Sequence, residues 1–355
     1  MNKIEFGDNR QTMKRWAEEG VKVQTCITSP PYYGLRDYGT GTWIGGDSNC
    51  SHKRDSKHSD KTITGHANLD LVVGDAIYKS TCPKCGAVRE DLQLGLEDTP
   101  EEYIENMVEV FRHVKNILAD DGTLWINIGD SYCGTGSKGD WVDPKNPEGR
   151  NGQAESKTKK LFGYKSKDLI GIPWMLAFAL RADGWYLRQD IIWHKPNPMP
   201  ESVQDRCTKA HEYIFLLSKS SKYYYDIESI KEDAHTTDDS NRNRDESRLN
   251  NTPGRTKMAG LTTNHYEKKN KRSVWTVTTK PYSGAHFAVF PSDLIEPCIL
   301  AGAPVGGIVL DPFMGSGTTA QVAQDLGRQY MGCELNPEYK KLQDQRLAQE
   351  SFVFE

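Results

Sequence analysis

Short apolar runs alternate with amphipathic helical patterns along most of this 355-residue chain, which predicts an α/β fold. A strand-like run over Lys3–Phe6 precedes a helix over Arg10–Glu19, and a buried strand is predicted over Val21–Ile27. Apolar residues then recur at steps of three and four from Tyr103 to Leu118, directly after the helix-start pair Thr99-Pro100.

The same alternation continues toward the C-terminus. Asp121-Gly122 predicts a turn into the next strand. The further elements expected are the strand Thr123–Ile128, the helix Pro173–Ala182, and the strands Trp185–Trp193, Glu212–Ser218, Val305–Leu310 and Tyr330–Cys333.

Three polar segments interrupt this rhythm: 40–96, 134–168 and 231–272. The first cannot bury enough apolar surface to order itself unaided, and the second fits either a mobile lid that orders on a polyanion or a merely solvated loop. The last of them is basic, because 242–272 holds nine Lys or Arg residues against three acids. We therefore divide the chain into an N-terminal segment (1–39), an insertion (40–96), a central segment (97–230) with a mobile basic loop (134–168), a second insertion (231–275) and a C-terminal segment (276–355).

Composition narrows the class of protein. Hydrophobic residues make up 36%, charged residues 26%, and the mean hydropathy of −0.69 fits an enzyme with long solvated loops. No apolar run approaches the roughly 18 residues of a membrane helix. The N-terminus has no apolar signal-peptide core, so we expect a cytoplasmic protein without disulfides.

The insertion 40–96 contains four residues that could hold a metal ion. Cys82-Pro-Lys-Cys85-Gly86 has the form of a knuckle that presents two thiolates to one tetrahedral ion. Cys50 and His52 supply a second pair, and the sequence therefore predicts a structural zinc site. The alternative is four reduced, unligated side chains in a disordered loop.

The strand Val21–Ile27 leads into Ser29-Pro30-Pro31-Tyr32. The two prolines fix φ and remove two N–H donors, which makes this stretch stiff and rich in acceptors. In an open α/β sheet, ligands bind at the carboxyl edge of the strands, where this stretch is expected. A Pro-rich turn with a core tyrosine is the alternative.

A second motif, Asp311-Pro312-Phe313-Met314-Gly315-Ser316-Gly317-Thr318-Thr319, follows the strand Val305–Leu310. Glycines after a strand allow close approach of a ligand, and Glu334 at the end of the next strand suits two ribose hydroxyls. The loop lacks both the dinucleotide-binding glycine pattern and the lysine of a P-loop. We therefore expect a nucleoside ligand without phosphates.

With Ser29–Tyr32 early and 311–319 late, the chain resembles the DNA amino-methyltransferases of the β arrangement, which transfer the methyl group of S-adenosylmethionine to an exocyclic base nitrogen. Gly122–Asp130, Arg188–Lys195 and the segment His286–Pro291 match other regions of that family. The resemblance implies a Rossmann-like methyltransferase fold: a mostly parallel seven-stranded sheet, helices on both faces, insertions and a circularly permuted motif order.

The resemblance also assigns roles to residues. Ser29, Pro30, Pro31 and Tyr32 would form the catalytic site, where Ser29 and the Pro30 carbonyl accept from the amine and Tyr32 stacks on a flipped base. The residues implied to bind the cofactor are Asp8, Phe287, Phe290, Pro291, Asp311, Pro312, Phe313, Gly315, Ser316, Gly317, Thr318, Thr319, Glu334 and Asn336.

Serine at the first motif position resembles the cytosine-N4 members of the family more than the adenine-N6 members, and both targets stay open. Two other interpretations are a non-catalytic, zinc-containing DNA-binding protein and a methyltransferase acting on RNA or on a protein amide. Double-stranded DNA is the expected partner, read by the insertion 231–275. A homodimer and a cognate restriction endonuclease, in a bacterial or phage setting, are further candidate partners.

Overall fold

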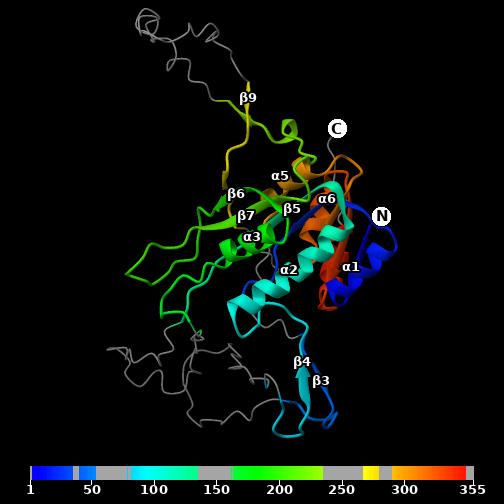
Figure 1. Cartoon of the computed structure of the whole chain (residues 1–355), viewed down its shortest axis with the longest axis vertical. Helices are drawn as coiled ribbons and strands as arrows, with labels where there is room; N and C mark the ends of the chain where they lie inside the picture. Colours follow the sequence, from blue (N-terminus) through cyan, green and yellow to red (C-terminus); the bar gives the residue numbers. More distant parts are fainter. Residues whose placement is uncertain are drawn as a thin grey trace, which may run out of the picture.

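The computed structural model describes residues 2–34, 40–52, 78, 81–134, 161, 163–234, 267–279 and 290–348. At its centre is an eight-stranded sheet in the order β1-β12-β11-β2-β5-β7-β6-β10 (Figure 1). The strands are β1 (Lys3–Phe6), β2 (Val23–Thr28), β5 (Leu118–Ile128), β6 (Tyr186–His194), β7 (His211–Ser218), β10 (Val274–Thr276), β11 (Ile308–Asp311) and β12 (Gln329–Glu334).

The sheet is mainly parallel, as expected. Only β7 runs antiparallel to its neighbours β5 and β6, and the other pairs are parallel. The sheet has one strand more than the seven expected, because β10 pairs alongside β6 with Val274 opposite Ile192. A three-residue strand inside a polar segment contains too few apolar residues to be predicted from the sequence.

Helices cover both faces of the sheet. On one face lie α1 (Asn9–Glu18), α2 (Pro100–Ile117) and α3 (Ile172–Ala182); on the other lie α5 (Ser292–Gly302), α6 (Thr318–Asp325) and α7 (Tyr339–Leu347) (Figure 1). Thr99 caps α2 through a hydrogen bond to the Glu102 N–H, as its sequence predicts. None of the described helices is both long and apolar enough to cross a bilayer.

Each central strand contributes side chains to two separate cores. Along β5, Leu124, Ile126 and Ile128 pack under the first helical layer, whereas Trp125 packs under the second. Burial on both faces explains why this strand reads as a nearly continuous apolar run. The turn predicted at Asp121-Gly122 falls inside β5, which begins at Leu118. The pairing with β2 is irregular there, between the pairs Val23–Leu118 and Thr25–Thr123, and Gly122 lies tightly against β2.

Two small antiparallel ribbons extend from opposite ends of the molecule (Figure 1). One is β3 (Thr42–Ile44) with β4 (Val88–Glu90), inside the predicted insertion 40–96. The other is β8 (Glu232–Asp233) with β9 (Lys268–Lys269), which follows the short helix η1 (Glu228–Ile230) inside 231–275. Most of the loop 134–168 lies outside the described residues.

Candidate active site

The end of β2 and the loop after β11 lie in direct contact. These strands are parallel neighbours, so their carboxyl ends meet at one edge of the sheet. The Thr28 hydroxyl donates to Asp311 Oδ1 over 2.6 Å, across a separation of 283 residues. Ser29, the next residue after Thr28, is therefore placed beside the glycine-rich loop.

The Asp311 carboxylate holds the start of that loop in place. Its carboxylate is 1% exposed and accepts from the Thr28 and Thr319 hydroxyls and from the Phe313 N–H. Burial raises the pKa of the Asp311 carboxyl to about 6, although these three hydrogen bonds lower it. Asp311 thus ties the catalytic strand, the loop and the start of α6 together.

The loop itself rests on β12 and α7. The Met314 N–H donates to the Cys333 carbonyl, and Met314 packs closely on Gly332, so that a Cβ there would force the Met314 side chain to shift. On the α7 side, Gln343 Nε2 donates to the Gly315 carbonyl over 2.7 Å. Gly317 has φ +87°, a conformation that glycine adopts without strain.

Neighbouring side chains hold the rest of the loop. Asn9 Nδ2 donates to the Pro312 carbonyl over 3.1 Å. The Thr318 hydroxyl accepts from Arg346 Nη1 over 2.5 Å. Ser316 Oγ is buried and has no hydrogen-bond partner among the described residues, so this loop still has a polar atom to satisfy. An orphaned hydroxyl within a glycine loop fits a cradle for a polar ligand.

Glu334 lies directly across the loop. Its two oxygens accept from the Gly315 N–H at 2.7 Å and from the Asn336 N–H at 2.8 Å. Burial raises the pKa of the Glu334 carboxyl to about 7. Each oxygen keeps a second lone pair, so the carboxylate can still accept ribose hydroxyls.

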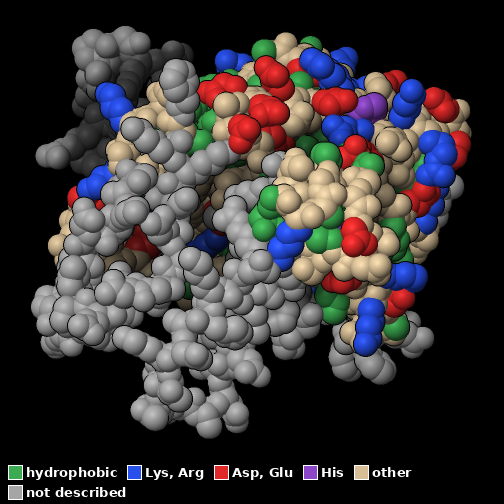
Figure 2. All heavy atoms as spheres, turned by 90° about the horizontal axis from the view of Figure 1, so that it is seen from below, with side chains coloured by type: hydrophobic (Ala, Val, Ile, Leu, Met, Phe, Trp, Pro, Cys, Tyr) green, Lys and Arg blue, Asp and Glu red, His purple; other side chains and the backbone are tan. Residues whose placement is uncertain are grey.

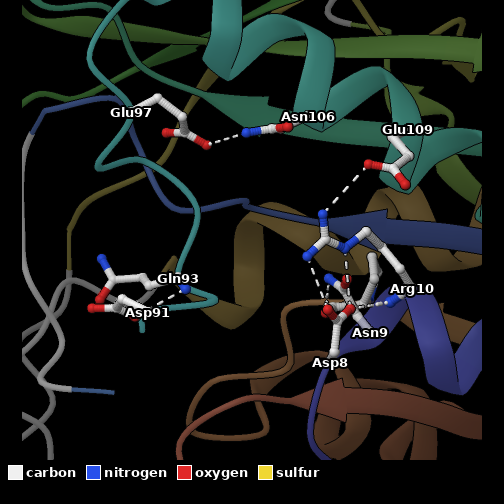
Figure 3. Close-up of polar contacts among 9 residues, drawn as sticks. Asp8, Asn9, Arg10, Asp91, Gln93, Glu97, Asn106 and Glu109 are labelled. Carbon is white, nitrogen blue, oxygen red and sulfur yellow. Dashed lines mark hydrogen bonds and ion pairs between the residues drawn. The ribbon is translucent and has the colours of Figure 1, made fainter. Parts of the chain in front are cut away.

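Asp8 caps α1, because its carboxylate accepts from the Arg10 N–H over 2.7 Å. The Arg10 guanidinium pairs with the same carboxylate and reaches on to Glu109 of α2, so Arg10 lies between the two acids (Figure 3). These hydrogen bonds and charges hold the pKa of Asp8 below its ordinary value although its burial acts the other way. A contact of Asp8 with adenine stays a prediction.

The predicted methionine-side wall is only partly described. Pro291 is buried and forms the N-cap of α5, and Phe290 packs against the second core. Phe287 lies outside the described residues. A role of these residues toward the cofactor stays a prediction.

Ser29–Tyr32, the stretch predicted to be catalytic, is held in place by residues on the α2 side. The Tyr103 hydroxyl donates to the Pro31 carbonyl over 2.9 Å, and the Gly34 N–H donates to the Gly95 carbonyl over 2.8 Å. A Cβ on Gly95 would stand 3.0 Å from the Tyr32 carbonyl oxygen, so this position accepts little but glycine. Pro31 is thus a backbone anchor of the turn.

The phenol of Tyr32 points toward a polar network at the start of β7. Its Oη lies 2.7 Å from Glu212 Oε2 and 3.2 Å from Asn127 Oδ1. Lys195 forms an ion pair with the other oxygen of Glu212 and lies over the Trp193 ring. Burial and the Glu212 charge raise the pKa of Tyr32 well above its ordinary value, so the phenol keeps its proton.

Comparison with known proteins decides the family. The protein family described as DNA methylase matches residues 23–345. The chain belongs to this DNA methylase family. It is 43% identical to type II methyltransferase M.SmaI of Serratia marcescens over 97% of this chain and 90% of that relative. It is also 40% identical to M.Cfr9I of Citrobacter freundii over 97% and 87% of the two chains.

Solved structures share the fold. The PvuII DNA methyltransferase, titled cytosine-N4-specific, superposes with a TM-score of 0.54 at 15% identity, over 99% of this chain and 88% of that one. A putative DNA modification methylase of Thermus thermophilus, in complex with S-adenosyl-L-methionine, gives 0.52 at 19% identity over 100% and 96%. The methyltransferase fold expected from the sequence is confirmed.

Family membership confirms the DNA amino-methyltransferase class, with S-adenosylmethionine as methyl donor and DNA as substrate. The glycine loop, the orphaned Ser316 hydroxyl and Glu334 are the groups of this methylase that fit such a donor. The four predicted catalytic residues lie at the adjacent strand end.

The four predicted metal ligands also lie together, at the ribbon β3–β4 of this methylase. The ligand atoms of Cys50, His52, Cys82 and Cys85 all lie within 4.8 Å of one another. Cys50 Sγ is 3.8 Å from Cys82 Sγ, and Cys85 Sγ is 3.6 Å from His52 Nδ1. Trp43 stacks on the His52 ring with centroids 4.3 Å apart, which fixes the orientation of the imidazole.

Sequence reasoning missed the groups around Tyr32. Asn127 is the one polar residue in the apolar run Leu124–Ile128, and Glu212 opens an apolar strand. A buried polar residue in such a run needs a hydrogen-bonding partner, which is the signal that could have found it. Asp130 was also missed; it caps α3 by accepting from the Gly171 and Ile172 N–H groups.

The described surface of this methylase carries both signs of charge. Seen from below, Lys and Arg side chains lie among Asp and Glu side chains, without one uniform basic patch (Figure 2). Most of the two basic segments predicted from the sequence falls outside the described residues. A basic DNA-binding surface formed by those segments stays a prediction.

Proposed function

We propose that this DNA methylase transfers the methyl group to the N4 amino group of cytosine within a specific duplex sequence. The observation that supports the proposal is the hydrogen bond from Thr28 to Asp311, because Ser29 follows Thr28 and Asp311 opens the glycine-rich loop. Ser29 offers a neutral hydroxyl acceptor, and serine at this motif position resembles the cytosine-N4 members of the family.

Methyl transfer requires little of the protein beyond the positioning of the two reacting atoms. The sulfonium methyl is already activated, so the amine nitrogen needs only to lie in line with the methyl carbon. As the N–C bond forms and the C–S bond breaks, the neutral thioether S-adenosylhomocysteine would leave, and acceptors near the amine hydrogens would stabilise the positive charge that develops on the nitrogen. The methylated nitrogen would then lose one proton to water. The Ser29 hydroxyl and the Pro30 carbonyl are the proposed acceptors, with the Tyr32 ring against a base that has left the duplex.

Adenine N6 is the second candidate target. Its exocyclic amine presents the same two hydrogens, and a hydroxyl acceptor serves either base. The two candidate functions therefore differ only in which base the space beside Tyr32 accommodates.

Sequencing of modified bases tests the proposal and separates the two targets. Genomic DNA without prior methylation is incubated with the enzyme and S-adenosylmethionine, and modified positions are read directly. N4-methylcytosine in one short recurring sequence supports the proposal, whereas N6-methyladenine would replace it with the second candidate. The same experiment gives the recognition sequence, which we assign to the insertion 231–275.

We also propose that Cys50, His52, Cys82 and Cys85 bind a structural zinc ion. Four ligands around tetrahedral zinc, with Zn–S near 2.3 Å and Zn–N near 2.0–2.1 Å, place two sulfurs about 3.8 Å apart and a sulfur and a nitrogen about 3.6 Å apart. The Cys50–Cys82 and Cys85–His52 separations of 3.8 and 3.6 Å match this geometry. The left-handed Gly86 that follows Cys85 suits the tight turn of a knuckle.

A further inference from the structure

Asn127 is a buried amide near the end of β5, and the proposed methyl transfer does not use it. Its side chain is 4% exposed, and it lies between the apolar residues Ile126 and Ile128. Burying an amide costs free energy unless both its oxygen and its nitrogen find hydrogen-bond partners. The partners of Asn127 therefore indicate what this residue does.

The two ends of the amide face different groups. Nδ2 donates to the Tyr213 carbonyl over 3.2 Å and to Glu212 Oε2 over 3.4 Å, whereas Oδ1 accepts from Tyr32 Oη over 3.2 Å. Reversing the amide would turn its oxygen toward two other acceptors, so only this orientation satisfies its neighbours. The Asn127 oxygen is thereby directed at the Tyr32 phenol.

Glu212 provides a second acceptor for the same phenol. Its Oε2 lies 2.7 Å from Tyr32 Oη, and Lys195 forms an ion pair with its other oxygen. The phenol has one proton, and the shorter bond to the carboxylate is the stronger of its two contacts because it is charge-assisted. Two acceptors on two neighbouring strands, β5 and β7, thus define where the phenol oxygen lies.

β5 is followed by a glycine that limits the edge of the same ring. A Cβ on Gly129 would stand 2.7 Å from Cε2 and 3.2 Å from Cδ2 of Tyr32, so the ring edge lies directly against the backbone there. A ring that is held at its oxygen and along one edge has a defined plane. Such a ring loses little conformational freedom when a base packs on it.

We propose that Asn127 and Glu212 are positioning residues that seat the Tyr32 phenol and thereby fix the plane of the ring on which the target base stacks. They act only through the Tyr32 oxygen and contact neither the base nor the cofactor. This inference rests on the proposed function, in which a flipped base lies against Tyr32, and it holds for either target base.

Single-turnover methylation by variants tests the seat. Tyr32→Phe keeps the ring but removes the oxygen, and it should lower the rate by about ten- to a hundredfold, the scale of a hydrogen bond to a charged group. Asn127→Ala should lower the rate by about three- to tenfold. Combining Asn127→Ala with Tyr32→Phe should cause no further loss, because both changes act through one oxygen.

A conservative variant provides a rescue test at the second acceptor. Glu212→Gln keeps an oxygen that can accept from the phenol, whereas Glu212→Ala removes the acceptor altogether. We expect the single-turnover rate of Glu212→Gln to exceed that of Glu212→Ala at least severalfold, at the same affinity for S-adenosylmethionine. Equal rates for the two variants would contradict the role of Glu212 as an acceptor for the phenol.

Base stacking is measured separately with duplex DNA that carries 2-aminopurine at the target position. Its fluorescence is quenched when the base stacks on an aromatic ring, so we expect a longer fluorescence lifetime with Asn127→Ala and Tyr32→Phe than with the wild type. Tyr225→Phe is the matched control, because its ring stacks on Trp125 in the other core. It should leave both the lifetime and the rate unchanged.

Two outcomes would overturn the inference: a wild-type rate in Tyr32→Phe, or a loss from Asn127→Ala that is equally large with and without the phenol. The second outcome would mark Asn127 as merely structural. Tyr32→Ala separates this inference from the proposed function. If Tyr32→Ala is inactive while Tyr32→Phe and Asn127→Ala match the wild type, only the seat is refuted; a fully active Tyr32→Ala would refute the stacking role of Tyr32 itself.

Discussion

Glu334, the residue predicted to bind the ribose of the cofactor, also has a raised pKa. Its carboxylate bridges the Gly315 and Asn336 N–H groups, and burial raises its pKa to about 7, near working pH. A carboxyl group that is protonated at lower pH offers one acceptor oxygen fewer to a ribose hydroxyl. Cofactor affinity should therefore depend on pH in the neutral range.

We expect the affinity for S-adenosylmethionine to increase as the pH rises from 6 to 8, because Glu334 becomes ionised over this interval. Glu334→Gln should weaken binding by about ten- to a hundredfold at pH 8 and should remove this pH dependence. Calorimetric titration at both pH values tests the prediction. A pH dependence that persists in the variant would assign it to another group.

The same raised pKa values of Glu334 and Asp311 affect the free protein with the opposite sign. Between the unfolded pKa values near 4 and the folded values of about 6 and 7, the folded state binds more protons than the unfolded state. These two carboxyls therefore make the cofactor-free protein less stable as the pH rises through this window. Melting temperatures at pH 5 and 7.5 should show the decrease, and Glu334→Gln should reduce it; an unchanged difference would contradict the assignment.

Gly129 controls the space available to the Tyr32 ring. A methyl group there would stand 2.7 Å from Tyr32 Cε2, inside any real carbon–carbon contact, so Gly129→Ala must displace the ring. We expect kcat to fall by at least about tenfold while the cofactor affinity stays unchanged, because the cofactor loop belongs to other strands. Single-turnover methylation and calorimetry measure the two quantities. Wild-type kcat would show that the ring position does not matter.

At the scale of elements, the ribbon β3–β4 connects the Cys/His cluster, which is the proposed zinc site, to the predicted catalytic stretch Ser29–Tyr32. The Thr40 hydroxyl and Arg89 both bond to Asp91, which joins the two sides of the ribbon near its base. A few residues further on, Gly95 accepts from the Gly34 N–H of the catalytic stretch. A metal ion bound at the far end of the ribbon would therefore also stabilise the end that contacts Tyr32.

We expect one zinc ion per chain in purified protein, and Cys82→Ser should lose it together with several degrees of melting temperature. Cys207→Ser is the matched control, because this exposed cysteine lies outside the cluster and should retain full zinc content. Elemental analysis and thermal melting give the two readouts. A zinc-free wild-type protein that takes up no added metal would contradict the site.

At the scale of the whole molecule, the order of the elements could be predicted from the sequence where buried residues form a regular apolar pattern. The strands predicted over Val21–Ile27 and Val305–Leu310 correspond to β2 and β11, whose bounds differ by one to three residues, and the helix predicted after Thr99-Pro100 corresponds to α2. β10 was missed because three residues in a polar segment carry no periodicity. The polar network of Glu212 and Asn127 was missed because its partners come from strands far apart in the chain.

The two motifs themselves could be found from sequence, but their contact could not. Nothing in the order of residues says that Thr28 donates to Asp311, since that bond depends on β2 and β11 becoming neighbours. The metal cluster is an intermediate case. Ligand types and the Cys82–Cys85 spacing were visible, and the fold brings Cys50 and His52 to them.

The central claim is that Ser29, held beside the cofactor loop, directs methyl transfer to the exocyclic amine of cytosine. The most direct measurement digests enzyme-treated DNA to nucleosides and identifies the methylated species by mass spectrometry, for wild type and for Ser29→Ala. We expect N4-methyl-deoxycytidine with the wild type and a loss of activity of at least about tenfold with Ser29→Ala, at unchanged cofactor affinity. Methylation of another base or atom, or a Ser29→Ala variant as active as the wild type, would contradict it.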